Sequence, residues 1–389
     1  MSSSRLSAWE AYPIGDKLAV VFEFGRAFTR CGFVNEHAPR IILRSNCLKR
    51  NDNLFEIEDE GDLYDALQLF IEPLYFKYLA VNPKDRKVII VESIFAPTKF
   101  RQTLAKVLIN YFEVPGIVFV PNHLMTMMTL MCSTGIVVDV GYTECCVTPV
   151  IEGITLVDSI HFRDLGGKAI HDRIQSHLIK HKATISYNGM PFSFDETEIQ
   201  ELTELEIEDI KVRTCFIPSF SRGQELIKAR IEKTAVQGSP KDVLYPLEGR
   251  KALTIPGIIR ESSAQVLFEA EGNEATISSL ILDVIERCPV DSRKSLASNI
   301  ILTGGTSLMT GFRRRIKQEL ENLVRVRNLP LDSSSLKFHS LPCPANYSSW
   351  LGGAIYGSTE ATSTRLITKK QLESPKGLLT TDWNLWTPN

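Results

Sequence analysis

The sequence lacks the features that would place the protein in a membrane, outside the cell or on nucleic acid. No apolar run approaches the length of a membrane span, and residues 1–16 contain no apolar core of a secretory signal. The formal net charge is only -2, so no bulk attraction to nucleic acid or to anionic lipid is expected. Low-complexity segments and short-period repeats are also absent. We therefore expect a cytoplasmic protein that binds no nucleic acid and inserts into no membrane.

Cysteine is scarce and unpatterned. The 389 residues include 8 cysteines, and none forms a C-x-x-C pair, which indicates reduced thiols rather than a disulfide framework. Cys145 and Cys146 are adjacent, and neighbours in a strand point to opposite faces, so two packed thiols are favoured over a redox pair. His177 and His181 lie four residues apart, with His171 six residues before His177, and this spacing suits zinc, but no carboxylate or cysteine lies close in sequence as a third ligand. We expect these histidines to be exposed.

The sequence does contain a recurring signal, a short apolar run followed by a turn with glycine. It occurs at residues 19–25, 135–141 and 299–305, and a fourth apolar run at 87–92 ends in a carboxylate. Consecutive apolar residues fit strands buried on both faces. Helical periodicity occupies the stretches between or after them, at residues 100–111, 166–182, 201–216, 276–287 and 311–324. This alternation predicts an α/β fold, and the length of 389 residues suggests at least two domains.

The glycine turns are candidates for phosphate binding. Backbone N–H groups approach a phosphate most closely where no Cβ obstructs them, and a carboxylate at a strand end can hold a metal ion. The candidate residues are Glu23, Gly25, Asp139, Gly141, Gly304, Gly305 and Thr306. Such turns also occur in sheets that bind nothing, but three in one chain favour a nucleotide cleft over plain turns.

Several segments, in order along the chain, resemble the motifs of the actin family. CPVDSRKSLASN at 288–299 and LTGGT at 302–306 are similar to the family's approach to the adenosine, and NYSSWLGG at 346–353 is similar to its next motif. FTRCGF at 28–33 and APR at 38–40 resemble its first phosphate loop and the segment that follows this loop. The remaining similar segments are residues 134–139, 150–153 and 209–215. The resemblance runs from about residue 18 to about residue 370.

The resemblance implies the actin fold, which heat-shock ATPases and sugar kinases share. That fold has two similar α/β domains around a nucleotide, here ATP or ADP with magnesium. The implied division is an extension at 1–17, a first domain at 18–133 with a reduced outer loop at 41–61, a second domain at 134–345, a return to the first at 346–372 and a tail at 373–389. Lys211 joins the candidate nucleotide-binding residues, and Asp139 is the candidate magnesium ligand.

Departures from the family affect the first loop. Glu23 replaces the family's aspartate, while Arg26 and Ala27 replace a serine and a glycine that lie against the phosphates. Arg26 could contact phosphate directly, because a guanidinium suits that geometry. The alternative is an exposed arginine or one that neutralises charge in the core, and it stays open.

Further departures affect hydrolysis. The family's second loop loses a carboxylate and a glycine, which become Tyr142 and Thr143. Met125 falls where the family orients water with glutamine, Cys146 replaces an assisting histidine, and Val212 replaces a glutamate that follows Lys211. Hydrolysis of a phosphoanhydride depends on oriented water and neutralised charge. We therefore expect that the protein is not an enzyme and that its ATP hydrolysis is negligible.

Within the family, the chain most resembles the subunit at the pointed end of dynactin. The segments that carry this resemblance are residues 81–88, 111–115, 122–130 and 165–169. It implies a structural subunit that caps a filament of actin-related subunits, contacts other pointed-end subunits and supports dynein-driven movement along microtubules. The alternatives are a slow ATPase or chaperone of the same fold and an actin-related protein of a chromatin complex.

Two altered segments favour capping. Residues 41–61 replace a long flexible loop of actins, and residues 268–274 replace an apolar plug with a turn that carries three carboxylates. Both regions belong to the stacking contacts of actins, so the chain should seat on a filament end, offer a poor seat to the next subunit and not polymerise alone. The candidate interaction residues are Asp52, Glu56, Glu58, Asp59, Glu60, Trp383 and Trp386. The two tryptophans could instead pack on the chain's own surface.

Overall fold

The computed structural model describes residues 17–46, 53–188, 190–191, 194, 196–249, 251–270 and 275–374. The predicted alternation of strands and helices is confirmed. The chain divides into two compact units. Within the described residues, the first unit comprises 17–129 and 349–374, and the second comprises 130–348.

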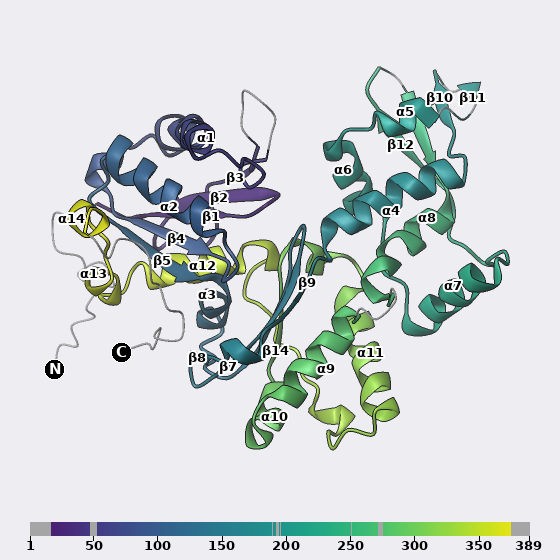
Figure 1. Cartoon of the computed structure of the whole chain (residues 1–389). Helices are drawn as coiled ribbons and strands as arrows, with labels where there is room; N and C mark the ends of the chain where they lie inside the picture. Colours follow the sequence, from purple (N-terminus) through teal and green to yellow (C-terminus); the bar gives the residue numbers. More distant parts are fainter. Residues whose placement is uncertain are drawn as a thin grey trace, which may run out of the picture. The chain divides into compact units, whose positions relative to one another are not determined.

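A five-stranded sheet forms the centre of the first unit (Figure 1), in the order β3-β2-β1-β4-β5. Its strands are β1 (Val20–Phe24), β2 (Phe28–Phe33), β3 (Ile41–Arg44), β4 (Val88–Glu92) and β5 (Ile117–Pro121). β1 runs parallel to β4 and β4 parallel to β5, whereas β2 is antiparallel to both β1 and β3. The carboxyl ends of β1, β4 and β5 therefore meet at one edge, where Glu23 and Glu92 lie.

Helices cover both faces of this sheet. They are α1 (Glu60–Pro73), α2 (Thr98–Lys106), α3 (Asn122–Met128), α12 (Ser348–Tyr356), α13 (Ala361–Thr364) and α14 (Lys369–Leu372). α1 and α2 continue into π-helical turns, η1 (Leu74–Leu79) and η3 (Val107–Tyr111), and pack with Phe22 and Ile90 in one core. On the other face, the fully buried Trp350 of α12 donates its indole N–H to the Val21 carbonyl at 3.1 Å. This bond fixes α12 against β1.

The second unit contains two sheets. The larger has the order β14-β6-β7-β8, with β9 also paired to β7, and the smaller has the order β11-β10-β13-β12. The strands are β6 (Gly135–Val140), β7 (Cys145–Ile151), β8 (Ile154–Thr155), β9 (His161–Arg163), β10 (Ile185–Tyr187), β11 (Met190–Pro191), β12 (Val243–Leu247), β13 (Lys251–Ile255) and β14 (Ile300–Thr303). β14 runs parallel to β6, which pairs antiparallel with β7.

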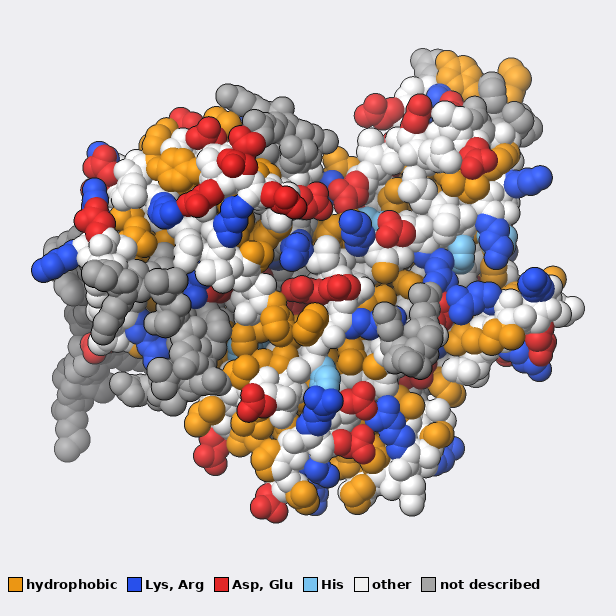
Figure 2. All heavy atoms as spheres, in the orientation of Figure 1, with side chains coloured by type: hydrophobic (Ala, Val, Ile, Leu, Met, Phe, Trp, Pro, Cys, Tyr) orange, Lys and Arg blue, Asp and Glu red, His pale blue; other side chains and the backbone are white. Residues whose placement is uncertain are grey.

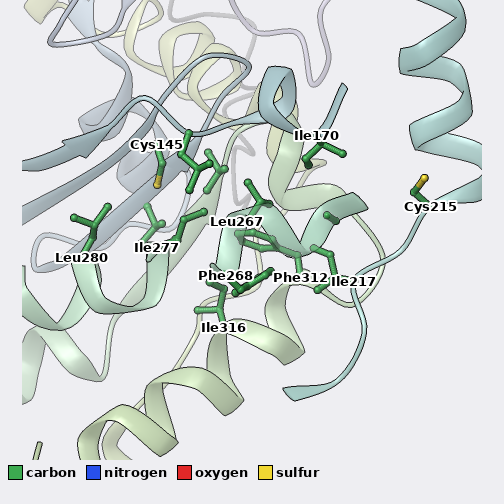
Figure 3. Packing of buried hydrophobic residues seen from close by; sticks show 14 of the residues in the cluster. Cys145, Ile170, Cys215, Ile217, Leu267, Phe268, Ile277, Leu280, Phe312 and Ile316 are labelled. Atoms are coloured by element: carbon green, nitrogen blue, oxygen red, sulfur yellow. The ribbon is translucent and has the colours of Figure 1, made fainter. Parts of the chain in front are cut away.

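The helices of the second unit are α4 (Gly167–Lys180), α5 (Glu196–Gln200), α6 (Glu204–Thr214), α7 (Phe220–Glu232), α8 (Gly257–Ser262), α9 (Ile277–Arg287), α10 (Val290–Ala297) and α11 (Phe312–Val326), with 3-10 turns η5 (Ser263–Phe268) and η6 (Gly305–Leu308). Four of these eight helices of the described residues, α4, α6, α9 and α11, coincide with the predicted periodic stretches, and the other four were not predicted. Figure 3 shows Ile277 of α9 near Cys145 of β7. In the same core, the Phe268 and Phe312 rings lie 6.1 Å apart. None of the helices within the described ranges is long and apolar enough to cross a bilayer.

The segment at 268–274, predicted to be a turn with three carboxylates, is described only as far as residue 270. Glu269 is buried, because only 5% of it is accessible. Its Oε2 accepts from Arg173 of α4 at 3.1 Å and from Arg230 of α7 at 2.6 Å. A buried charge of this kind is held in place by its partners. Glu271 and Glu274, the other two carboxylates of that prediction, lie outside the described residues.

Candidate nucleotide-binding site

In the second unit, two of the predicted glycine turns come together. The parallel pairing of β14 with β6 places Thr303 opposite Asp139, so both strands end side by side. Gly304 follows with φ +88°, and a Cβ there would lie 2.3 Å from the Val140 carbonyl oxygen and 2.5 Å from Asp139 Oδ1. Only glycine tolerates both this conformation and this approach. At Gly305 the nearest described atom to such a Cβ is 4.0 Å away, which leaves space for a ligand.

The turn at Gly141 is bonded into its surroundings. Thr306 Oγ1 donates to the Gly141 carbonyl at 2.7 Å, and the Gly167 N–H donates to the same oxygen at 3.1 Å. The Lys168 N–H donates to the Tyr142 carbonyl at 2.7 Å. The first N–H groups of α4, which at a helix start are available to an anion, are thus committed to protein carbonyls. The anion-binding capacity of this helix end is reduced.

Lys211 lies in a buried cluster beside these turns. Its Nζ donates to Glu208 Oε2 at 2.5 Å and is 3.1 Å from His171 Nε2, which is itself 2.7 Å from Glu208 Oε2. Burial alone would raise the pKa of Glu208, but the hydrogen bond from His171 and the nearby Lys211 ammonium lower it to about 2. The Tyr142 ring stands edge-on to the His171 ring at 5.4 Å, and its hydroxyl bonds to Glu204. The positive charge of Lys211 is therefore balanced within the protein.

The prediction that the histidines are exposed is wrong for His171, which is 4% accessible. Its role was missed, although the sequence held a signal. His171 lies three and seven residues before Ile174 and Leu178, two buried residues of α4, so helical periodicity puts it on the buried face. His181 is exposed, whereas His177 is half-buried and lies 3.1 Å from the Ser262 hydroxyl.

Cys146 and Met125, at the two positions expected to aid hydrolysis in the family, are both buried. Cys146 pairs across the sheet with Asp139, so the two side chains share a face. Burial raises the pKa of the Cys146 thiol to about 12, and its sulfur lies 3.3 Å from Thr148 Oγ1. Met125 is 1% accessible in α3 of the first unit. A protonated thiol and a thioether provide no general base. Cys145 is also free and buried, as the interpretation of two packed thiols requires.

In the first unit, Arg26 and Ala27 form the tight turn between β1 and β2. The Gly25 N–H donates to the Phe28 carbonyl at 3.1 Å and closes this turn. The resulting register places Glu23 opposite Arg30, whose Nη1 lies 3.4 Å from Glu23 Oε1. Sequence reasoning missed Arg30, although a two-residue turn at 26–27 would have predicted this pairing.

Glu23 is thus held by residues of its own unit. Besides the ion pair with Arg30, its Oε1 accepts from the Ser349 hydroxyl at 2.8 Å. Arg30 is only 9% accessible, and a Cβ on Gly25 would lie 3.3 Å from its Nη1. A buried cation therefore lies directly beside the first glycine turn.

Arg26 extends along the segment that follows β3. Its guanidinium carbon lies 5.6 Å from the centroid of the Phe55 ring, which is a cation–π contact. Its carbonyl accepts from Asn53 Nδ2 at 2.6 Å. Contact of Arg26 with a phosphate stays a prediction.

The predicted acidic interaction residues have different surroundings. Glu56 and Glu58 are exposed. Asp59 caps α1 by accepting from the Asp62 N–H at 2.9 Å, and Glu60 pairs with Lys106 at 2.6 Å on the surface. Part of this charge therefore stabilises the start of α1. Asp52, Trp383 and Trp386 lie outside the described residues.

The residues present fit a nucleotide better than a metal ion bound by protein alone. Within the described ranges, no three side chains of His, Cys, Asp or Glu are grouped as a metal site. The close approach at Gly304 and the space at Gly305 are compatible with a nucleotide.

Comparison with known families and proteins agrees with this geometry. The family model for actin matches residues 15–375 of the chain. The actin-related protein 10 of Dictyostelium discoideum is 24% identical over 429 aligned residues, which cover 92% of this chain and 86% of that protein. Both findings confirm the resemblance seen in the sequence motifs.

Proposed function

The chain belongs to the actin family, and on this basis we propose that it is a non-catalytic structural subunit of dynactin. In that role it caps the pointed end of a filament of actin-related subunits, contacts the other pointed-end subunits and supports dynein-driven transport on cytoplasmic microtubules. The similarity to an actin-related protein 10 along 92% of the chain supports this proposal.

The observation that carries the proposal is the inward packing of residues 41–46 and 53–57, which we call the outer segment. Leu54 of this segment is fully buried, and its N–H donates to the Ser45 carbonyl at 2.9 Å. The Phe55 ring stacks on Phe100 of α2 at 4.3 Å. These described parts are bound to their own unit and do not extend as an arm. A subunit whose described outer segment packs inward in this way would retain one stacking face and offer a poor second one.

A bound nucleotide, ATP or ADP with magnesium, is part of the proposal. Gly304, Gly305, Thr306 and Lys211 would hold its nucleoside side, and Gly25, Arg26 and Gly141 its phosphate side, with Asp139 and Glu23 as the acidic residues. Gly305→Trp tests this assignment because it fills the space without a positive φ. ATP affinity measured by calorimetry should be lost, and an unchanged affinity would remove Gly305 from the site.

The experiment for the main proposal is size-exclusion chromatography of a cell extract that contains the tagged full-length chain. We expect elution in a very large complex together with dynein-associated proteins. Elution as a monomer that consumes ATP would favour the second candidate, a slow ATPase or chaperone, which the intact third glycine turn supports. Elution with chromatin proteins would favour the nuclear alternative.

A further inference from the structure

Three successive carbonyls of the first glycine turn are bonded to the outer segment. The Ser45 hydroxyl donates to the Gly25 carbonyl at 2.5 Å, and the Ser45 N–H donates to the Ala27 carbonyl at 3.0 Å. Between them, Asn53 Nδ2 donates to the Arg26 carbonyl at 2.6 Å. Two residues of the outer segment therefore hold every carbonyl of the turn.

These two residues are themselves fixed in place. Ser45 is fully buried, and its hydroxyl also lies 2.8 Å from Thr29 Oγ1. Asn53 Oδ1 accepts from the Phe55 N–H at 3.0 Å, on the residue whose ring stacks on α2. The turn and the outer segment thus form one hydrogen-bonded assembly.

This arrangement determines where the N–H groups of the turn point. In a planar trans peptide the C=O and N–H point in opposite directions. Since the Gly25 and Arg26 carbonyls face Ser45 and Asn53, the N–H groups of Arg26 and Ala27 face away from the outer segment. Within the described residues neither N–H has an acceptor. Two successive N–H groups on one side of a turn favour an anion.

A buried guanidinium, paired with Glu23, lies next to Gly25 of this turn. Arg30 is 91% buried, as its 9% accessibility shows, and its Nη1 approaches Gly25. Its Nε has no hydrogen-bond partner among the described residues. A guanidinium with an unused donor adds to the attraction for phosphate oxygens. The turn therefore retains anion-binding chemistry although the family's serine is absent.

We propose that Ser45 and Asn53 are positioning residues that orient the first turn toward the phosphates of a bound nucleotide and link that ligand to the outer segment. The proposal rests on nucleotide binding as part of the proposed function. A phosphate on the turn should stabilise the outer segment, and by linkage a fixed outer segment should strengthen phosphate binding. Nucleotide occupancy would then influence the surface on which capping depends.

The test compares ligands with and without phosphates on the full-length chain. Calorimetry gives dissociation constants for ATP, ADP and adenosine with wild type, Ser45→Ala and Asn53→Asp. Asn53→Asp keeps the acceptor for the Phe55 N–H but removes the donor to the Arg26 carbonyl. We expect either change to weaken ATP about tenfold, as for one lost hydrogen bond, and to leave adenosine unchanged.

The matched control is Asn82→Ala. Asn82 makes a similar side-chain bond, to the Lys84 N–H at 3.1 Å, but precedes the amino end of β4, at the opposite edge of the sheet from the turn. We expect it to leave the ATP-to-adenosine ratio unchanged. Equal weakening of ATP and adenosine in Ser45→Ala would indicate a merely structural role and overturn the proposal.

Hydrogen exchange provides the second readout. In wild type, amides of residues 41–46 and 53–57 should exchange more slowly with ATP than with adenosine, and both variants should lose this difference. A wild type without a phosphate-dependent effect would overturn the link while leaving the dynactin proposal standing. Failure of the dynactin proposal would instead appear as the absence of co-elution with dynein-associated proteins. It would leave the ratio of the ATP and adenosine affinities unchanged.

Discussion

At the residue scale, Glu92 is a buried carboxylate whose ionisation should affect stability. Burial raises its pKa from 4.5 to about 7, despite the opposing Arg101 guanidinium at 3.3 Å. Because the pKa is raised in the folded state, its contribution to stability is full below pH 4.5 and is lost as pH rises through about 7. Between those limits the free energy of unfolding should fall by roughly 3 kcal/mol relative to Glu92→Gln. Urea unfolding from pH 4.5 to 8 measures this difference.

The control for Glu92 is Glu113→Gln, which alters an exposed carboxylate paired with Lys84. Its stability should parallel that of wild type across the range. Parallel curves for wild type and Glu92→Gln would mean that the buried carboxyl does not titrate there.

Gly304 gives a second prediction at the residue scale, and Gly249 is the matched control position. Both have positive φ, +88° and +73°, but a Cβ at Gly249 would meet no described atom within 4 Å. Alanine at Gly249 should therefore cost only the strain of the left-handed conformation, about 1 kcal/mol. Alanine at Gly304 adds a collision with Val140 and Asp139. The free energy of unfolding should therefore fall by at least roughly 2 kcal/mol more than in the Gly249 variant. Urea unfolding compares them, and equal losses would show that the turn relaxes freely.

At the element scale, α4 and α6 are joined by the cluster of His171, Glu208 and Lys211. Hydrogen bonds hold the pKa of Glu208 at about 2, so its contribution is present above 4.5 and is lost as pH falls through about 2. We expect Glu208→Gln to lower the free energy of unfolding at pH 7 by roughly 2 kcal/mol, a figure reduced because 23% of the side chain is accessible. The deficit should shrink in acid. Glu232→Gln, at an exposed pair with Lys228, should show no such deficit.

These elements also show which features of the fold could be predicted from the sequence. The strands and helices were predictable because apolar periodicity reports directly on which face is buried. The first, second and third turns were predictable because glycine marks positions that require a close backbone approach. The burial of Glu269 was not predictable, because its partners Arg173 and Arg230 are 96 and 39 residues away in the sequence. No local pattern encodes such pairing.

The first turn illustrates the limit more sharply. Arg26 and Ala27 look damaging when compared with the family's serine and glycine, since a side-chain donor and a small residue are lost. In the structure the turn remains ordered through Ser45 and Asn53, which are 20 and 27 residues from the carbonyls that they hold. Substitutions within a loop therefore do not alone decide whether it binds phosphate.

At the scale of the whole molecule, we expect ATP hydrolysis to be negligible even where ATP binds. Met125 and Cys146 are buried and provide no base, and Glu23 is tied to Arg30 and Ser349. Phosphate release in a single turnover should not exceed that of the double variant Glu23→Ala, Asp139→Ala. A clear excess that requires magnesium would contradict this expectation.

Assembly is the last prediction at this scale. Head-to-tail stacking requires two complementary faces, and we expect the inward packing of the outer segment to leave one of them incomplete. The exposed carboxylates of Glu56 and Glu58 add like-charge repulsion, weakened but not abolished at high salt. The chain alone should therefore form no filament, yet should bind one end of a filament of its actin-related partner and stop growth there.

Sedimentation with purified partner filaments measures this outcome. Binding should be substoichiometric, one chain per filament, and should increase when the filaments are sheared because shearing multiplies ends at constant mass. The double variant Glu56→Gln, Glu58→Gln should still bind the filament end, since the face that contacts the filament is unchanged. It should only make the rejection of a further subunit less dependent on salt. Binding in proportion to filament mass, or filament formation by the chain alone at micromolar concentration, would show that both stacking faces are functional.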